Sequence, residues 1–349
     1  MLTIISGIGL LLLTLGVFSL FSLKFPKGQE AMSGMANAAV ATFLVEAIHH
    51  YITGNLMGIK FFEVVGSTSG SLGGCAAAIL VPISMGVNPI FAVVAGVAVG
   101  SYGILPGFIA GYVVGFVAPF IEKHLPEGLD IILGALVVAP LARFIAMFVD
   151  PGVTSVLEHI GVTISAATSI SPILMGLLLG GIMKMICTSP LSSMALTAML
   201  GLTGLPMGIA AIACVGGSFT NGMVFHRMKF GNKSNVIAVM MEPLTQADIV
   251  TSHPLPIYCS NFFGGGLSGI GAALLGIVNN APGTASPIPG LLAPFAFNPI
   301  WKVLLAVAIA AVCGTAAGYV GSSVFLKLQK GSLKEKLMPQ VAPELEGEA

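Results

Sequence analysis

The sequence predicts an all-α protein that crosses a membrane several times. Its 349 residues are 56% hydrophobic and only 8% charged, with a mean hydropathy of +0.99. Soluble domains carry about 25% charged residues, so a water-soluble fold has no means of burying this much apolar surface. Glycine (45) and proline (21) are abundant, which suits close helix packing and broken helices. Because a helix needs about 20 apolar residues to span a bilayer, the chain has room for roughly eight to ten crossings.

Composition also excludes several classes of function. The formal net charge is zero, so we expect no nucleic-acid partner. Five cysteines are scattered singly without a Cys-x-x-Cys pair, which favours apolar filler over a metal site or a disulfide. No Walker loop, Gly-x-Ser-x-Gly or zinc-ligand spacing occurs, so we expect no cofactor, no metal and no soluble-enzyme activity.

The first part of the chain alternates apolar spans with polar edges. Residues 2–23 form an apolar run without a basic leader, which predicts a first helix rather than a removable signal peptide. Residues 30–52 are less apolar, and Glu46 and His50 share one helical face. A water-facing helix edge explains that pair more simply than a ligand site. The small polar run at 66–71 suits either a hydroxylated solute or a close helix contact, and both interpretations stay open.

The middle of the chain predicts packed spans and a surface crossover. One span carries Gly107, Gly111 and Gly115 at four-residue spacing, which predicts a smooth groove against a neighbouring helix. Residues 129–149 are the next span. Residues 151–171 are mildly amphipathic, and we expect them to lie along the membrane surface.

The final third predicts broken helices and an orientation. Lys184 interrupts an apolar run that breaks at residues 188–193, and residues 301–326 form the last span. Basic residues cluster at 226–233 and again after residue 326, which predicts that both groups are cytoplasmic. We therefore expect one membrane domain over residues 1–326 and a short polar cytoplasmic tail over 327–349.

Residues 231–290 predict the functional site. An apolar run at 236–241 stops at Glu242 and Pro243 and does not resume for more than a dozen residues. A second apolar run, 257–278, leads into a stretch rich in proline and glycine at 279–290. Unpaired backbone at membrane depth is tolerated only beside protein or a wet cavity. The pattern therefore predicts two re-entrant hairpins that face a water-filled chamber.

Glu242 is the principal candidate for binding a solute. A carboxylate within a membrane costs roughly 2.5–3.5 kcal/mol on insertion scales, so it needs a role, and it accepts hydrogen bonds from two sugar hydroxyls at once. The alternative is a solvated acid at a hairpin tip, paired with Lys233. For the polar residues near Pro254 a loop or a helix cap competes with binding. The remaining candidates are Thr245, Gln246, Asp248, His253, Asn279, Asn280 and Ser192.

Several of these segments resemble a known family. Residues 110–115 (Ala-Gly-Tyr-Val-Val-Gly) and the loop at 122–126 are similar to the membrane subunit IIC of sugar phosphotransferase systems, the fructose type in particular. Later pieces occur in the same order, from the break at 188–193 through Met241-Glu242-Pro243 to 289–290. A compact IIC-like branch, the perfringolysin O regulator-like membrane proteins, resembles the chain more closely still. The resemblance covers most of the chain beyond the first fifty residues.

The resemblance implies a fold, a function and partners. In that family a glutamate on a re-entrant hairpin binds sugar hydroxyls, and Glu242 matches its position, while residues 279–290 match the last hairpin. The family implies a homodimer in the bacterial inner membrane. Fructose-type proteins carry an Asp-x-Gly-Gly-Pro-x-Asn-Lys run where this chain has residues 187–193 without those groups, so fructose itself is not implied. The sequence shows no soluble IIB domain, and any phosphotransfer would need separate IIB and IIA proteins.

Three hypotheses follow for function. The first is a carrier of a sugar or polyol that alternates access around Glu242 by moving the hairpin-bearing portion against the glycine-packed remainder. The second is a membrane sensor or regulator that keeps the carrier fold without transport. The third is an ion- or proton-coupled transporter with Glu242 and Asp248 as protonatable sites.

Overall fold

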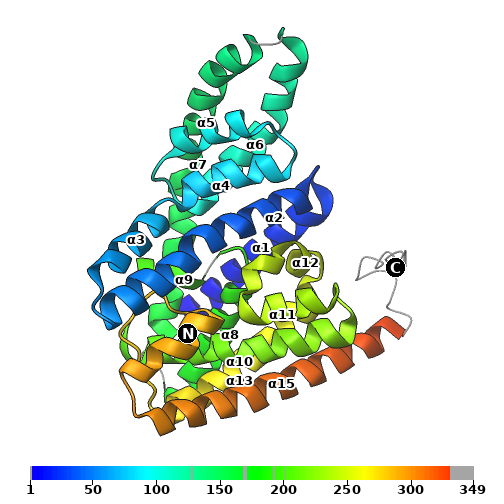
Figure 1. Cartoon of the computed structure of the whole chain (residues 1–349). Coiled ribbons are helices and arrows are strands. Elements are labelled where there is room, and N and C mark those ends of the chain that lie inside the picture. Colours follow the sequence, from blue (N-terminus) through cyan, green and yellow to red (C-terminus); the bar gives the residue numbers. More distant parts are fainter. Residues whose placement is uncertain (1, 127–128, 168–170, 192, 201, 331–349) are drawn as a thin grey trace.

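A computed structural model of the protein describes residues 2–126, 129–167, 171–191, 193–200 and 202–330 (Figure 1). These residues form helices joined by short turns, and no strand occurs among them. The all-α prediction is confirmed.

Four helices form a bundle at the top of Figure 1. They are α4 (Gly73–Ser84), α5 (Pro89–Val99), α6 (Ile104–His124) and the first half of α7 (Leu129–Ala167). A Cβ atom at Gly107 of α6 would lie 2.1 Å from the carbonyl oxygen of Gly74 in α4. The predicted glycine groove therefore packs directly against a neighbouring helix, where no side chain fits between the backbones.

A second bundle occupies the other end of the molecule (Figure 1). Its members are α8 (Pro172–Thr188), α10 (Gly204–Met228), α13 (Pro254–Leu274) and α15 (Ile300–Lys330). A Cβ at Gly180 of α8 would lie 2.5 Å from the carbonyl oxygen of Gly265 in α13. Gly176 and Gly269 make the same kind of contact, so α8 and α13 touch backbone to backbone over at least a full turn.

The N-terminal helices lie between the two bundles. They are α1 (Leu2–Lys24), α2 (Gly28–Ala39), the π-helical segments η1 (Val40–Leu44) and η2 (Ala47–Leu56), and α3 (Lys60–Ser71). α2 contacts α4 in one bundle and also α12 (Ala247–Ser252), where Gln29 Nε2 donates to Ser252 Oγ at 3.0 Å. These helices therefore connect the top bundle to the segment that carries Glu242.

Fewer helices have the length of a full span than the sequence suggests. Among the described residues five helices are long and apolar enough to cross a membrane, or six if the bent pair α3–α4 counts as one span. The estimate of eight to ten counted apolar stretches that fold as short helices, such as α5 with 11 residues. The segment predicted as a surface crossover, residues 151–171, does not begin as a separate element, because α7 runs unbroken through Pro151 to Ala167. Its position along the membrane surface stays a prediction. Helices within membranes tolerate such a proline when neighbours satisfy the freed carbonyl.

Short helices fill the predicted breaks. They are α9 (Ser193–Met199), α11 (Lys233–Met241), η3 (Pro243–Gln246), α12, α14 (Pro287–Leu292) and η4 (Ala293–Ala296). Asn232 and Asn235 form a reciprocal capping box that starts α11. The helix ends at Glu242 because proline disfavours the helical conformation in the residue before it, and Glu242 is extended with φ −148° and ψ 101°.

Candidate functional site

Glu242 joins the two breaks that the sequence singles out. Its extended backbone turns the side chain into the protein, where it is only 3% exposed. Ser286 Oγ, from the loop that precedes α14, donates a hydrogen bond to Glu242 Oε2 at 2.6 Å. The two segments are 44 residues apart in sequence, so this contact ties the first break to the second.

The other carboxyl oxygen of Glu242 is without a partner. Oε1 is buried and makes no hydrogen bond in the described part of the chain. A buried polar atom in this condition costs about 1–3 kcal/mol, so a ligand hydroxyl that donates to Oε1 recovers free energy. Glu242 lies outside the helices long enough to span a membrane. Burial raises the pKa of its carboxyl to about 7, and the neighbouring Cys187 adds to the rise. The hydrogen bond from Ser286, the nearby backbone N–H of Leu244 and the charge of Lys184 oppose it.

Asn279 and Asn280 both hold the loop that carries Ser286 in place. Asn279 is fully buried, its Nδ2 donates to Thr284 Oγ1 at 2.9 Å, and its Oδ1 accepts from the backbone N–H of Ala281 at 3.0 Å. Asn280 Oδ1 accepts from the N–H of Gly204 at the start of α10, at 3.1 Å. Both asparagines therefore fix the loop that carries Ser286, one from within and one against α10.

The same loop is anchored from two other sides. Thr197 Oγ1 of α9 accepts from the N–H of Gly283 at 3.2 Å, and Ser193 Oγ donates to the carbonyl oxygen of Ala285. The Tyr51 ring of η2 packs against Gly283 so closely that a Cβ there would lie 2.3 Å from the ring. Gly283 also has φ +79°, which glycine adopts without strain. These contacts hold the loop in place where Ser286 meets Glu242.

Thr245 and Gln246 support the turn after Glu242. Thr245 Oγ1 donates to the backbone carbonyl of Glu242 at 2.7 Å. Gln246 Oε1 accepts from Asn235 Nδ2 at 2.6 Å, and its Nε2 donates to the Thr245 carbonyl at 2.8 Å. These side chains therefore position Glu242 through the backbone and the capping box.

Asp248 and His253 are not brought to the Glu242 carboxyl by any hydrogen bond among the described residues. The half-buried His253 contacts the carbonyl oxygen of Ile249 at 3.1 Å and packs on Phe230 with ring centroids 4.1 Å apart. Burial lowers the pKa of His253. Asp248 is half-buried on α12, and Ser252 Oγ donates to its backbone carbonyl at 2.7 Å. Ser192 lies outside the described residues.

A buried polar row crosses the second bundle, and sequence reasoning passed over it. Asn261 Nδ2 of α13 donates to Asn221 Oδ1 of α10 at 2.6 Å, and Asn221 Nδ2 donates to Thr188 Oγ1 of α8 at 3.5 Å. Lys184, one turn before Thr188, is also fully buried. The one signal in the sequence was Lys184 itself, since a charge inside an apolar run marks a functional position by default.

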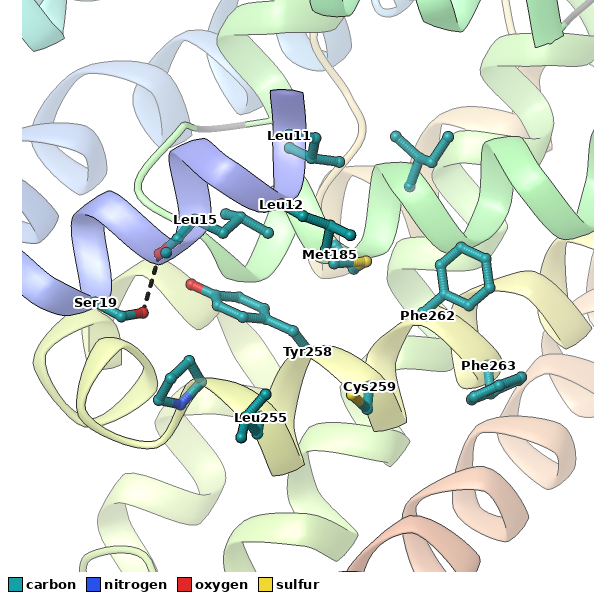
Figure 2. A pocket seen from close by; sticks show the side chains of 13 residues that line it. Leu11, Leu12, Leu15, Ser19, Met185, Leu255, Tyr258, Cys259, Phe262 and Phe263 are labelled. Carbon is teal, nitrogen blue, oxygen red and sulfur yellow. Dashed lines mark hydrogen bonds between the residues drawn. The ribbon is translucent and has the colours of Figure 1, made fainter. Parts of the chain in front are cut away.

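The pocket between α1, α8 and α13 has a different character (Figure 2). Its volume is about 400 Å³, and its lining is almost wholly apolar, including Leu15, Met185 and Phe262. Figure 2 shows the Tyr258 ring pointing from α13 toward α1, and its buried hydroxyl has no partner in the described part of the protein. A sugar needs several hydrogen-bond partners, so this pocket does not suit one.

Comparison with known proteins bears on the identity of this membrane fold. Residues 29–338 match the family model described as "Phosphotransferase system, EIIC". The chain belongs to that family. No curated protein and no solved structure matches it.

Membership in the EIIC family agrees with the apolar helices and gives them a function. The protein is a multi-pass membrane protein of the sugar-permease type. The family implies a sugar substrate and separate IIA and IIB partner proteins.

Proposed function

We propose that this EIIC protein carries a sugar or polyol across the membrane and that Glu242 binds its hydroxyl groups. The main support for the proposal is that Oε1 of Glu242 is buried without a hydrogen-bond partner in the described part of the chain. The other carboxyl oxygen, Oε2, already accepts a hydrogen bond from Ser286. An EIIC subunit implies a sugar substrate, and a sugar hydroxyl is the kind of donor that this oxygen lacks.

The arrangement of the two breaks supports a binding chamber between them. α11, η3 and α12 form the first interrupted segment, and the loop at residues 275–286 with α14 forms the second. We propose that both are re-entrant hairpins, since their backbone is non-helical at the Glu242–Ser286 contact and is buried in protein. The Ser286 loop then lines one side of the chamber, and Glu242 lines the other side.

Alternating access is proposed as movement of the second bundle against the first. The first bundle has a core of its own, which includes Phe91, Val114 and Val138. The larger core includes Leu179, Ile212 and Ile257 of the second bundle, and Val81 of α4 and Phe108 of α6 meet it from the first bundle. Motion between separately packed bodies disturbs fewer contacts than motion within one of them. We further propose a homodimer in the bacterial inner membrane, with the phosphoryl group supplied by separate IIA and IIB proteins. The finer assignment to the fructose-type or regulator-like branch is part of the same proposal.

The test compares Glu242→Gln with the wild type in purified protein and in vesicles. The substitution keeps the shape but removes the charge, and hydrogen bonds to charged groups contribute about 1.5–3 kcal/mol each. We expect the affinity for the best sugar in a screen to fall about ten- to a hundredfold. Glu158→Gln, the same change at an exposed position on α7, is the matched control and should bind as the wild type does.

Three results would contradict the proposal or a part of it. Unchanged sugar affinity in Glu242→Gln would remove Glu242 from the site. Sugar binding without accumulation, in vesicles supplied with IIA and IIB proteins, would refute transport and favour a sensor. Uptake driven by a pH gradient without those proteins would favour an ion-coupled transporter.

A further inference from the structure

The buried Lys184 side chain lies in a space that glycines on neighbouring helices leave open. The residue lies near the end of α8 and has no exposed surface. A Cβ at Gly217 of α10 would lie 2.0 Å from Lys184 Cε, and one at Gly265 of α13 would lie 2.4 Å from Lys184 Cβ. Glycines on two neighbouring helices therefore make room for the lysine stem and direct it into the bundle.

The ammonium group at the end of this stem is poorly satisfied. Its hydrogen bond is to Cys187 Sγ at 3.9 Å, and no carboxylate lies within 4.0 Å of it in the part of the chain that the structure describes. An ammonium has three donors, and a buried unpaired charge costs several kcal/mol. A residue this costly, in a space built around it, points to a partner that completes the site.

Glu242, in the same region, lacks a hydrogen-bond donor for one oxygen of its carboxyl group, whereas Lys184 has donors to spare. α8 contacts η3, the turn that follows Glu242. The charges of Lys184 and Glu242 are close enough to influence each other, although they do not form a direct ion pair. One group has unused donors and the other has an unused acceptor, Oε1.

We propose that Lys184 is a second solute-binding residue and that, with Glu242, it selects an uncharged polyol over acidic or amino sugars. Lys184 donates to one hydroxyl oxygen of the solute, and Glu242 accepts from another hydroxyl. This inference rests on the proposed function and names its substrate class. Glu242 keeps the hydroxyl-binding role already proposed for it, and the binding role of Lys184 is the new element.

The charge balance explains the selection. A neutral solute leaves the opposite charges of Lys184 and Glu242 compensating each other across the site. A solute carboxylate or phosphate would place a second negative charge beside Glu242, and a solute amine would place a second positive charge beside Lys184. Like charges in a buried site of low dielectric repel strongly.

The test measures binding of a neutral hexose, its uronic acid and its amino sugar to the full-length protein, for each hexose that binds the wild type. Lys184→Met should lose at least about tenfold in affinity for the neutral hexose. Its preference for the hexose over the amino sugar should fall by a similar factor, because only Glu242 remains charged. In Glu242→Gln, where only Lys184 remains charged, the preference over the uronic acid should fall likewise.

A structural role for Lys184 predicts different results. Lys184→Met removes a buried unpaired charge, so without sugar it should melt no lower than the wild type. Equal hexose affinity in Lys184→Met and the wild type would overturn the inference, and so would weaker binding with an unchanged charge preference. If Lys184→Met does not fold, Glu242→Gln decides alone: tighter binding of the uronic acid than of the hexose requires the remaining positive charge of Lys184 in the site, and equal or weaker binding of the uronic acid excludes it. A wild type that binds no sugar would refute the proposed function itself.

Discussion

Titration of Glu242 should make the sugar-free protein less stable at alkaline pH. Burial raises the pKa of this carboxyl from 4.5 to about 7. A group whose pKa is raised in the folded state contributes stability that is fully present below the unfolded value and is lost as pH rises through the folded value. Because each pKa unit corresponds to 1.36 kcal/mol, the difference between 4.5 and about 7 predicts a loss of about 3 kcal/mol between pH 4.5 and pH 8.

The assay is unfolding of the detergent-solubilised protein without sugar, followed over pH 5–8 in the wild type and in Glu242→Gln. Other groups titrate equally in both proteins, so the difference between the two curves isolates Glu242. We expect the wild type to lose stability relative to the variant steadily from pH 5 to pH 7, by about 1.36 kcal/mol per pH unit, and the difference to level off above pH 7. Parallel curves over this window would refute the interpretation that the carboxyl is buried and short of a partner.

Two further changes test the packing and the loop. Gly180→Ala should lower the melting temperature, since its Cβ would lie 2.5 Å from the Gly265 carbonyl oxygen and overpacking costs about 1–3 kcal/mol. Gly16→Ala is the control, because nothing lies within 4 Å of a Cβ at that position. Equal melting temperatures for the two variants would contradict the backbone contact. Thr197→Val should weaken sugar binding and destabilise the protein by about 1–3 kcal/mol, because it leaves the buried N–H of Gly283 without its acceptor. Binding and melting curves like those of the wild type would show that the loop does not need this anchor.

Local chemistry explains why the breaks in the chain were predictable. Pro243 forces Glu242 out of the helix, and the residues that start α11 are a reciprocal asparagine cap. Both effects act within a few residues, so the sequence alone contains them. The path of α7 was not predictable in this way. Pro151 predicts a helix end by the same local rule, yet the helix continues through this exposed proline, and the residues around it carry no signal that marks the exception.

The contacts within the site could not be predicted from the sequence, because they join residues that are distant along the chain. Glu242 was identified because a carboxylate in an apolar run is costly wherever it lies. Its partner Ser286 lies 44 residues away, and only the folded loop brings the two together. The same cost argument applies to Lys184, but its significance depends on Gly217 and Gly265, whose missing side chains on two other helices create the space for it. Asn279 shows the converse, since its polar groups are used within its own loop.

The hydrogen bonds of the second bundle determine which part of the site moves as a unit. Ser218 Oγ of α10 donates to the carbonyl oxygen of Met240 at 2.6 Å, two residues before Glu242, and Gly290 of α14 packs on Ala211 of α10. Glu242 and the Ser286 loop are therefore both fastened to α10. Lys184 lies against the same helix through Gly217. If access alternates as proposed, the donor and acceptor groups that hold a sugar move together, and the contacts that change are those of the first bundle with the N-terminal helices, α4 with α2 and α7 with α1.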